Sequence, residues 1–202
     1  MISIDPDTQA ERDNYKLLTG SIIPRPIAFV TTLSEEGVIN GAPFSYFNIA
    51  SSSPPMVSLS IQRSGSKQKD TARNILQQKE FVIHIVDEIN VQQVNETAAR
   101  LSPDKSEIKL AQLTTVESTK VSVPGIKQTK VRMECRLEHS LELGDKDMAV
   151  NDFLIGKVVQ FHIHRDIYKN GRIDHEKLAA VSRLAGAYYA KFGEVFEIER
   201  PQ

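Results

Sequence analysis

Tryptophan is absent from this sequence of 202 residues, and cysteine occurs once, as Cys135. A single cysteine excludes an intrachain disulfide and a metal site built from several cysteines. Such cysteine usage is typical of a reducing compartment, so we expect a cytoplasmic protein. No apolar run reaches the roughly 20 residues that a membrane-spanning helix requires. The charged residues among positions 1–20 leave no room for the apolar core of a signal peptide, and we expect no membrane partner.

The sequence also lacks an excess of positive charge and the common nucleotide-binding motifs. Its formal net charge is −1, whereas proteins that bind nucleic acids usually carry a basic patch, so we expect no nucleic-acid partner. Neither the GxGxxG pattern nor the P-loop pattern occurs, which argues against a Rossmann or P-loop nucleotide site. No nucleophile-elbow sequence is present, although residue counts alone leave a Ser-His-Asp triad open.

Length and composition favour one globular domain. The chain is 40% hydrophobic and 25% charged, which is ordinary for a soluble protein. A domain of this length buries roughly 70% of its unfolded surface. No repeat, low-complexity tract or linker interrupts the sequence, so we interpret residues 1–202 as a single domain.

Most of the chain has the pattern of β-strands. Apolar or alternating runs predict strands at residues 27–33, 56–61, 80–86, 131–143, 153–164 and 194–198. The run 131–143 places apolar residues on one face and charged residues on the other, which is typical of a half-buried antiparallel strand. The charged face consists of Arg132, Glu134, Arg136 and Glu138. Gly156 marks an expected bulge or close backbone approach.

Helical patterns are fewer and shorter. They occupy residues 70–76, 91–101 and 174–184, and the first begins with Asp70, a favoured N-cap residue. Many antiparallel strands with a few scattered helices predict a mainly β protein with a closed or partly closed barrel.

The loop RSGSKQKDT, residues 63–71, is the first candidate binding site. It follows a strand and leads into a helix, whose N-terminus has free N–H groups that suit a phosphate. Arg63, Lys67 and Lys69 add positive charge, and Ser66 and Thr71 add hydroxyl donors. The alternative is a solvated loop in which Asp70 caps the helix, and charged loops of that kind are common.

Two further segments are candidates for ligand contact. The polar loop 44–53 contains Ser45, Asn48 and three consecutive serines, whose side chains could bind the edge of a heterocycle or satisfy their own turn. Near the C-terminus, Arg183 precedes two adjacent tyrosines and Phe192. Arginine and aromatic residues often form ligand walls, but the same segment could simply dock on the barrel.

The histidines and the cysteine are expected to be structural. His162 and His164 share a strand face but have no third metal ligand nearby, so we interpret them as solvent-facing residues. His84 alternates with apolar neighbours and is expected to be half-buried with its hydrogen bonds satisfied. Cys135 shares a face with apolar residues and is expected to pack rather than react. We therefore assign no catalytic residue and no metal site.

The order of several motifs resembles the flavin reductase-like family, in its flavoredoxin-type branch. The motifs are RPIAFVTTLSEEGVINGAPFSYFNIASSSPPMVSLSI, KDTARNI, FVIHIV followed by VNETAA, MECRLEHSLELGD, FLIGKVVQFHI, GRID and SRLAGAYYAKFGEVFEIERP. Each motif alone is weak evidence for the family, but together the motifs cover nearly the whole chain in this order. The resemblance implies an FMN-binding split β-barrel of Greek-key antiparallel type with a few peripheral helices. Phe29 departs from the tryptophan that many relatives have there.

The resemblance also implies a homodimer with FMN near the subunit interface. Residues 47–52 would line the isoalloxazine ring, the 63–71 loop would bind the phosphate, and the C-terminal aromatics Tyr188 and Phe192 would help to close the site. The implied cofactor-binding residues are Arg25, Phe47, Asn48, Ile49, Ala50, Ser51, Ser52, Arg63, Ser66, Lys69, Asp70, Thr71, Asn95, Arg183 and Tyr189.

The activity implied is reduction of FMN by NADH or NADPH, followed by electron transfer to an unidentified small-molecule or protein acceptor. The cofactor carries the difficult chemistry in such reactions, so a conspicuous catalytic acid or base is not required. Two alternatives stay open. One is an FMN electron carrier that a partner protein reduces, and the other is a barrel whose flavin site has become a partner-binding surface.

Overall fold

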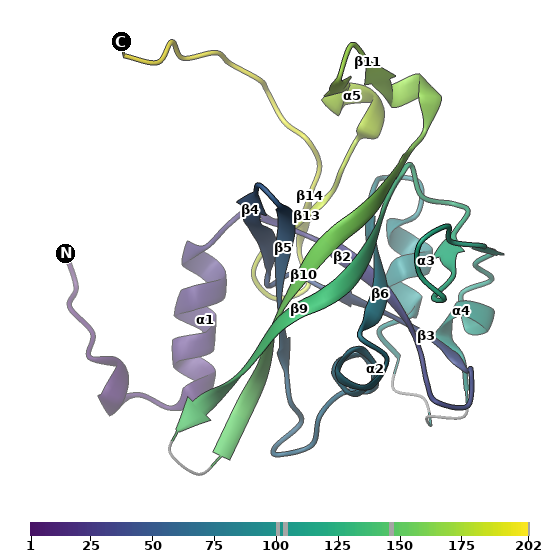
Figure 1. Ribbon diagram of the computed structural model, residues 1–202. Coiled ribbons are helices and arrows are strands. Elements are labelled where there is room, and N and C mark those ends of the chain that lie inside the picture. Colours follow the sequence, from purple (N-terminus) through teal and green to yellow (C-terminus); the bar gives the residue numbers. More distant parts are fainter. Residues whose placement is uncertain (100–101, 103–104, 146–147, 202) are drawn as a thin grey trace.

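The computed structural model describes residues 1–99, 102, 105–145 and 148–201, and antiparallel strands dominate it (Figure 1). Seven strands form one sheet in the order β3-β2-β6-β9-β10-β5-β4. Their bounds are β2 Ala28–Leu33, β3 Ile39–Phe44, β4 Phe47–Ser52, β5 Pro55–Gln62, β6 Glu80–Ile85, β9 Val131–Asp145 and β10 Met148–Ile163. The predicted mainly β class is confirmed.

The sheet curls because its two edge strands are consecutive in the chain. β3 ends at Phe44 and β4 begins at Phe47, so only residues 45–46 connect strands at opposite ends of the strand order. Such a short connection brings both edges of the sheet close together, and the twist of antiparallel strands allows this closure. The result is the split barrel that was predicted.

An apolar cluster fills the barrel, and helix α2 (Asp70–Gln78) covers one end of it. The helix contributes the fully buried side chains of Ala72 and Ile75. It ends at Gln78, and the C-cap residue Lys79 has a left-handed φ of 61°. Burial of the apolar face therefore holds α2 against the barrel. The strand residues of the cluster are Ala28, Val30, Phe44, Val57, Leu59, Ile61, Phe81, Ile83, Met133, Cys135, Leu154 and Val158.

Gly156 has both of the features expected from its position in a long strand. The pairing of β10 with β9 shifts in register between Ile155 and Gly156. A Cβ atom at Gly156 would lie 2.3 Å from the ring of Phe81. The glycine therefore lets two strands and a core aromatic approach closely. Cys135 is fully buried in the same cluster, as predicted.

Three expectations on secondary structure are wrong in part. Asp70 is the first residue of α2 and pairs with Arg73, whereas Lys69 occupies the N-cap. The helix expected over 174–184 reduces to α5 (His175–Leu178), because Ala179 turns left-handed and Val181 donates to the carbonyl of Val86. Residues 194–198 form no strand within the described part of the chain.

The remaining elements surround the barrel. Helix α1 (Glu11–Ser21) was not predicted. Helix α3 (Val91–Glu96) is shorter than the expected helix 91–101, because residues 97–99 form a turn and a bend, and residues 100–101 lie outside the described residues. No described helix is long and apolar enough to cross a membrane. The short elements are η1 (Pro6–Thr8), β1 (Arg25–Pro26), α4 (Glu107–Leu110), β7 (Thr115–Val116), β8 (Gly125–Ile126), η2 (Arg165–Ile167), β11 (Tyr168–Lys169), β12 (Arg172–Ile173), β13 (Ser182–Arg183) and β14 (Tyr189–Ala190).

Two residues that were expected to face solvent, Glu134 and His162, instead form polar contacts with other parts of the chain. Glu134 is fully buried and accepts hydrogen bonds from the Thr119 and Lys120 amides. These bonds hold the loop before β8 against β9. His162, expected to face solvent, lies 2.5 Å from the Glu134 carboxylate and is 24% exposed. His164 lies beyond the end of β10 and caps η2. The alternating pattern alone could not show that a neighbouring loop covers the charged face of β9.

His84 is fully buried rather than half-buried, and both ring nitrogens have partners. Its Nδ1 lies 2.9 Å from the Phe29 carbonyl, and its Nε2 accepts from the Ile126 amide at 2.9 Å. The ring therefore connects β2, β6 and β8 as a neutral Nδ1–H tautomer. Burial lowers the pKa of His84 to about 3, because the apolar surroundings disfavour the imidazolium.

This pKa predicts a loss of stability in mild acid. Below pH of about 6.5 the unfolded chain binds a proton at His84 that the folded chain refuses, so folding stability should fall as the pH drops toward 3. The slope should be about 1.4 kcal/mol per pH unit. Urea unfolding of wild type and His84→Gln from pH 7 to pH 4 measures it. The His84→Gln protein should be less stable at pH 7 and less sensitive to acid, and the exposed His139→Gln control should keep the wild-type slope. Equal slopes in wild type and His84→Gln would contradict the prediction.

Candidate functional site

A pocket of about 150 Å³ lies where α1, the β3–β4 turn, the start of α2 and β13 meet. Three positively charged residues line it, Arg25, Lys69 and Arg183, and none of its lining residues among those that the structure describes is a carboxylate. We call it the basic pocket. Its other lining residues are Tyr15, Thr19, Pro43, Phe44, Ser45, Tyr46, Ser60, Gln62 and Leu184. Three cations gathered at one pocket suit an anionic group.

Lys69 enters the pocket from the N-terminus of α2. Its Nζ lies 5.6 Å from the centre of the Phe44 ring, within the range of a cation–π contact. No side chain caps the α2 N-terminus, all of whose residues are described, so the partial positive charge of the helix adds to that of Lys69. Asp70 is paired with Arg73 at 2.6 Å, and Ser66 lies in the exposed turn that precedes the helix.

Arg25 has a different role from the one expected. Arg25 is buried, with 7% of the residue exposed, and it donates from Nη1 to the carbonyls of Thr19 and Ile22 at 2.8 and 2.6 Å. Its Nη2 donates to the Leu184 carbonyl at 3.0 Å. Arg25 thus lines the basic pocket, but most of its donors hold the end of α1 against the C-terminal segment.

Arg183, Tyr189 and Asn95 form a connected series, although Asn95 is distant from the other two in sequence. The Arg183 guanidinium lies 4.4 Å from the centre of the Tyr189 ring, and its Nη2 donates to the Gly186 carbonyl at 2.6 Å. The Tyr189 hydroxyl donates to Asn95 Oδ1 at 3.0 Å. The structure therefore brings these three predicted residues together within one chain.

Tyr189 and Asn95 line a second pocket, between α3 and the β14 strand. This pocket has a volume of about 420 Å³ and is mostly apolar. Its remaining lining residues are Glu88, Val91, Gln92, Val181, Ala190 and Lys191. Lys191 pairs with Glu88 at 2.5 Å at its rim. Arg183 borders the basic pocket while the tyrosine stacked on it borders the second one.

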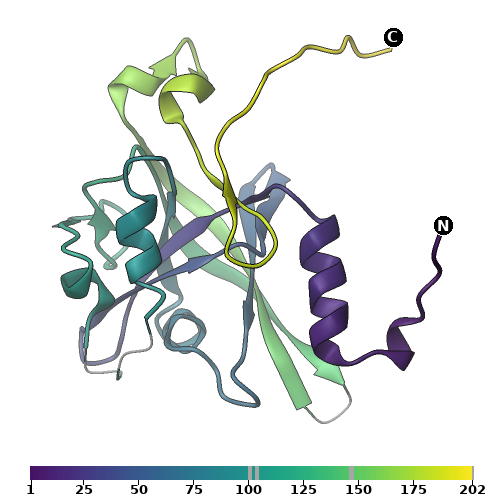
Figure 2. The same cartoon turned by 180° about the vertical axis from the view of Figure 1, so that it is seen from behind.

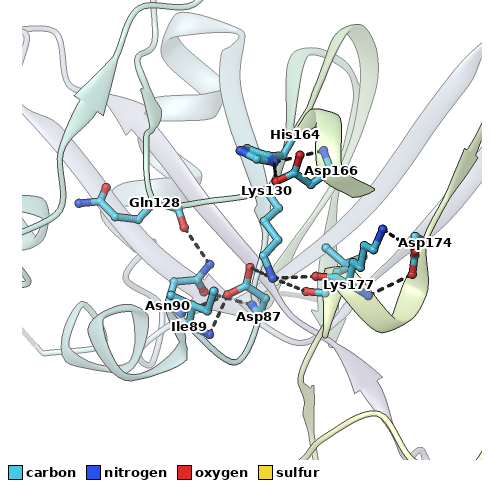
Figure 3. A network of polar contacts seen from close by, with 10 residues as sticks. Asp87, Ile89, Asn90, Gln128, Lys130, His164, Asp166, Asp174 and Lys177 are labelled. Carbon is cyan, nitrogen blue, oxygen red and sulfur yellow. Dashed lines mark hydrogen bonds and ion pairs between the residues drawn. The ribbon is translucent and has the colours of Figure 1, made fainter. Parts of the chain in front are cut away.

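An ion pair between buried Asp87 and partly buried Lys130 holds the segment that precedes Arg183 (Figure 3). Lys130 Nζ donates to the carbonyls of Lys177 and Leu178 and lies 3.4 Å from Asp87, which is fully buried. The other Asp87 oxygen accepts from the amides of Ile89 and Asn90. The sequence analysis missed both members of this pair. The Asp87–Asn90 spacing is a turn signal that could have indicated the aspartate, but nothing local indicated Lys130.

Residues 47–52, predicted as a loop, form the edge strand β4. β4 pairs with β5 alone in the sheet, and the register shifts between Ile49 and Ser51, so Ala50 has no ladder partner. Asn48, Ile49 and Ala50 are exposed. The free edge of β4 therefore presents backbone N–H and C=O groups beside small side chains, which suits the polar edge of a flat ligand. Part of the predicted turn also satisfies itself, because Ser53 N donates to Ser51 Oγ at 3.2 Å.

Arg63 and Thr71 do not line the basic pocket. Arg63 donates to both oxygens of buried Asp152, at 3.1 and 2.6 Å, and to Glu142 at 2.7 Å. These carboxylates raise the pKa of Arg63. Thr71 is 2% exposed, and its hydroxyl accepts from Asn40 at 2.9 Å. Both residues thus support the fold here, a distinction that the spacing in the 63–71 loop could not reveal.

The sequence analysis missed Tyr15 and Thr19, which wall the basic pocket from α1. It missed them because the helix itself was not predicted, since its apolar residues are few and mixed with charges. Phe29 is fully buried and lies beside His84, with ring centroids 5.5 Å apart, so it cannot stack on a ligand in this arrangement.

Comparison with known proteins finds relatives in sequence and in fold. The chain is 49% identical to YwrF of Bacillus subtilis, an uncharacterized protein, over 204 residues that span 100% of each chain. Its structure matches nitrilotriacetate monooxygenase component B from Bacillus cereus with a TM-score of 0.97 at 55% identity, over 98% of each chain. It matches 2-nitrobenzoate 2-nitroreductase NbaA of Pseudomonas fluorescens with a TM-score of 0.89 at 26% identity, over 99% of this chain and 96% of that one.

A family description also matches most of the chain directly. The flavin reductase like domain matches residues 19–179. This range includes β4, Lys69 and the whole seven-stranded sheet. The chain belongs to the flavin reductase-like family.

Proposed function

We propose that this protein is an FMN-dependent oxidoreductase that takes a hydride from NADH or NADPH and passes electrons to a second acceptor. The observation that carries the proposal is the basic pocket beside the open edge of β4, in a chain that belongs to the flavin reductase-like family. A basic pocket next to the flat backbone edge of β4 suits a ligand in which a phosphate is joined to a planar heterocycle.

The residues present suit FMN. Lys69 and the amides at the start of α2 would bind the phosphate, with Arg183 as the second cation of the pocket. The β4 edge, including Asn48 and Ala50, would contact the polar rim of the isoalloxazine. Arg25 would act by holding α1 and Leu184 in place around the ligand.

FMN, when bound, supplies the hydride acceptor and the electron donor. The protein then has to bind FMN, orient it and shield it from water, which explains why no catalytic acid or base is needed. Tyr46 lines the pocket, and burial raises the pKa of its phenol. It therefore stays a neutral hydrogen-bond donor at physiological pH.

The reductive half-reaction is tested by an anaerobic titration. FMN-loaded protein is titrated with NADH and, separately, with NADPH while the absorbance of oxidised flavin is followed. We expect prompt bleaching with at least one donor, because the β4 edge leaves one face of the site open for a nicotinamide. Persistent colour with both donors would favour the electron carrier, and protein that refuses FMN would favour the partner-binding alternative.

Lys69→Ala should weaken FMN binding by roughly ten- to a hundredfold, since a lost charge-assisted hydrogen bond is worth about 1.5–3 kcal/mol. Riboflavin has no phosphate, so its affinity should hardly change. Fluorescence titration with both flavins measures the difference. Lys67→Ala is the matched control, because Lys67 is an exposed lysine of the same loop outside the basic pocket. An equal loss of affinity for both flavins, or no loss of FMN affinity, would show that the phosphate does not bind at Lys69.

Arg63→Met should give the opposite pattern. It leaves the buried Asp152 carboxylate without its cation, so the free energy of unfolding should fall. FMN affinity, measured below the unfolding transition, should stay near that of wild type. If instead FMN affinity falls as far as in Lys69→Ala with stability unchanged, Arg63 is the phosphate ligand.

A further inference from the structure

Four polar side chains are buried together near the start of α2, beside the apolar core of the barrel. Thr32 lies on β2, Asn40 on β3, and Thr71 and Asn74 on α2. Their exposed fractions are between 0% and 8%. We call these four residues the buried polar cluster. None of them carries a charge and none lines the basic pocket, so ligand contact does not explain why they are polar.

Asn40 links the helix to the sheet within this cluster. Its Nδ2 donates to Thr71 Oγ1 on α2 at 2.9 Å and to Thr32 Oγ1 on β2 at 3.3 Å. Thr32 and Asn40 lie directly opposite each other on their paired strands. Asn74 Nδ2 donates to the same Thr32 oxygen at 3.1 Å. Because hydrogen bonds are directional, these contacts fix both the rotation of α2 and its position along the sheet.

Stability alone does not account for the buried polar cluster. Asn74 Oδ1 is buried and has no hydrogen-bond partner among the described residues, and an unpaired buried oxygen destabilises a fold. Apolar groups of the same shape in place of both partners of a buried hydrogen bond can be nearly neutral. The apolar side chains of Ala72 and Ile75 already hold α2 on the barrel. What the cluster adds is the selection of one arrangement of the helix.

The start of α2 depends on such contacts. The helix has nine residues, and isolated helices shorter than about 12 residues are marginal in water. Both views show it nearly along its axis, at the lower end of the sheet (Figures 1 and 2). Lys69 immediately precedes the helix and borders the basic pocket, and its carbonyl accepts from the Arg73 amide at 3.0 Å. Thr71 lies only two positions further on, so a bond that fixes Thr71 also fixes Lys69.

We propose that Asn40 is a positioning residue for the phosphate end of the flavin site. By holding Thr71 against Thr32, it fixes the first turn of α2 so that Lys69 and the helix amides lie at the basic pocket before the ligand arrives. A cation that is already in place loses less conformational entropy when it binds an anion. The inference rests on the proposed function for the identity of the ligand, but the placement of Lys69 does not.

Amide hydrogen exchange on flavin-free protein tests the placement of Lys69. The Arg73 amide donates to the Lys69 carbonyl, so its exchange reports whether the start of α2 is formed. Asn40→Leu keeps a branched side chain but removes both donors. Relative to the slowest amides of the sheet, the Arg73 amide should then exchange roughly tenfold faster than in wild type, through local opening of the helix start. An unchanged relative rate would overturn the proposal.

A matched control and a conservative pair separate this effect from a general loss of stability. Thr31 is fully buried on the other face of β2, and its hydroxyl donates to the Pro124 carbonyl at 2.8 Å. Thr31→Val should therefore destabilise the protein without changing the relative exchange of the Arg73 amide. Thr71→Ser keeps the oxygen that accepts from Asn40, whereas Thr71→Val does not. Only Thr71→Val should loosen the Arg73 amide, and equal exchange in the two Thr71 variants would overturn the proposal even if Asn40→Leu fails to fold.

Flavin titrations test the link to the ligand. Asn40→Leu should weaken FMN binding roughly three- to tenfold and change riboflavin binding by less than about twofold, because only FMN has a phosphate for Lys69 to bind. In a Lys69→Ala background, Asn40→Leu should cause no further loss of FMN affinity, since coupled residues are not additive.

The outcomes distinguish this inference from the proposed function. Equal losses of affinity for both flavins, or a further loss in the Lys69→Ala background, would overturn the inference, because Asn40 would then support only the fold. Normal FMN affinity in Asn40→Leu would also overturn it while the proposed function stands. A wild type that binds no FMN, together with an Arg73 amide that Asn40→Leu loosens, would refute the proposed function and leave the placement of Lys69 by Asn40 intact.

Discussion

Burial of the apolar inner face of the curled sheet is the constraint on which the rest of this structure depends. The two-residue β3–β4 connection brings the sheet edges together, and α2 covers one end with Ala72 and Ile75. Because Lys69 is the N-cap residue of α2, the packing of this helix places Lys69 beside Phe44 at the end of β3. The position of the charged pocket is therefore a consequence of core packing.

The second half of the site depends on how the C-terminal segment is held. Lys130 reaches the carbonyls of residues 177 and 178 from the start of β9, and Arg25 reaches the carbonyl of Leu184. These long-range bonds place Arg183 against Tyr189 and the basic pocket. Removal of Lys130 would leave the buried Asp87 carboxylate without its cation, which is costly, so we interpret this pair as the feature that keeps a short, weakly paired hairpin in register.

Much of the fold could be predicted because strand signals are local. The five long internal strands followed their apolar or alternating runs to within a few residues at most ends, and Gly156 was recognisable by its place in such a run. Errors arose where tertiary contacts override local pattern. The pattern predicted Glu134 on the outer face, yet a loop covers it. Residues 179–184 were predicted as helix, yet they pair with residues 86–88, just after β6, and with β1. α1 escaped notice because few of its residues face the body.

The sequence by itself determined the mainly β class, the family resemblance and the list of polar residues from which a flavin site could be made, because these depend on residue type and spacing. Only the tertiary structure decided which of those residues face one another. Arg63 and Lys69 are six positions apart in one loop, yet one is bound to Asp152 and the other borders the basic pocket. That separation follows from the partners that barrel closure brings to each, and those partners are up to about ninety residues away in sequence, where local pattern carries no information.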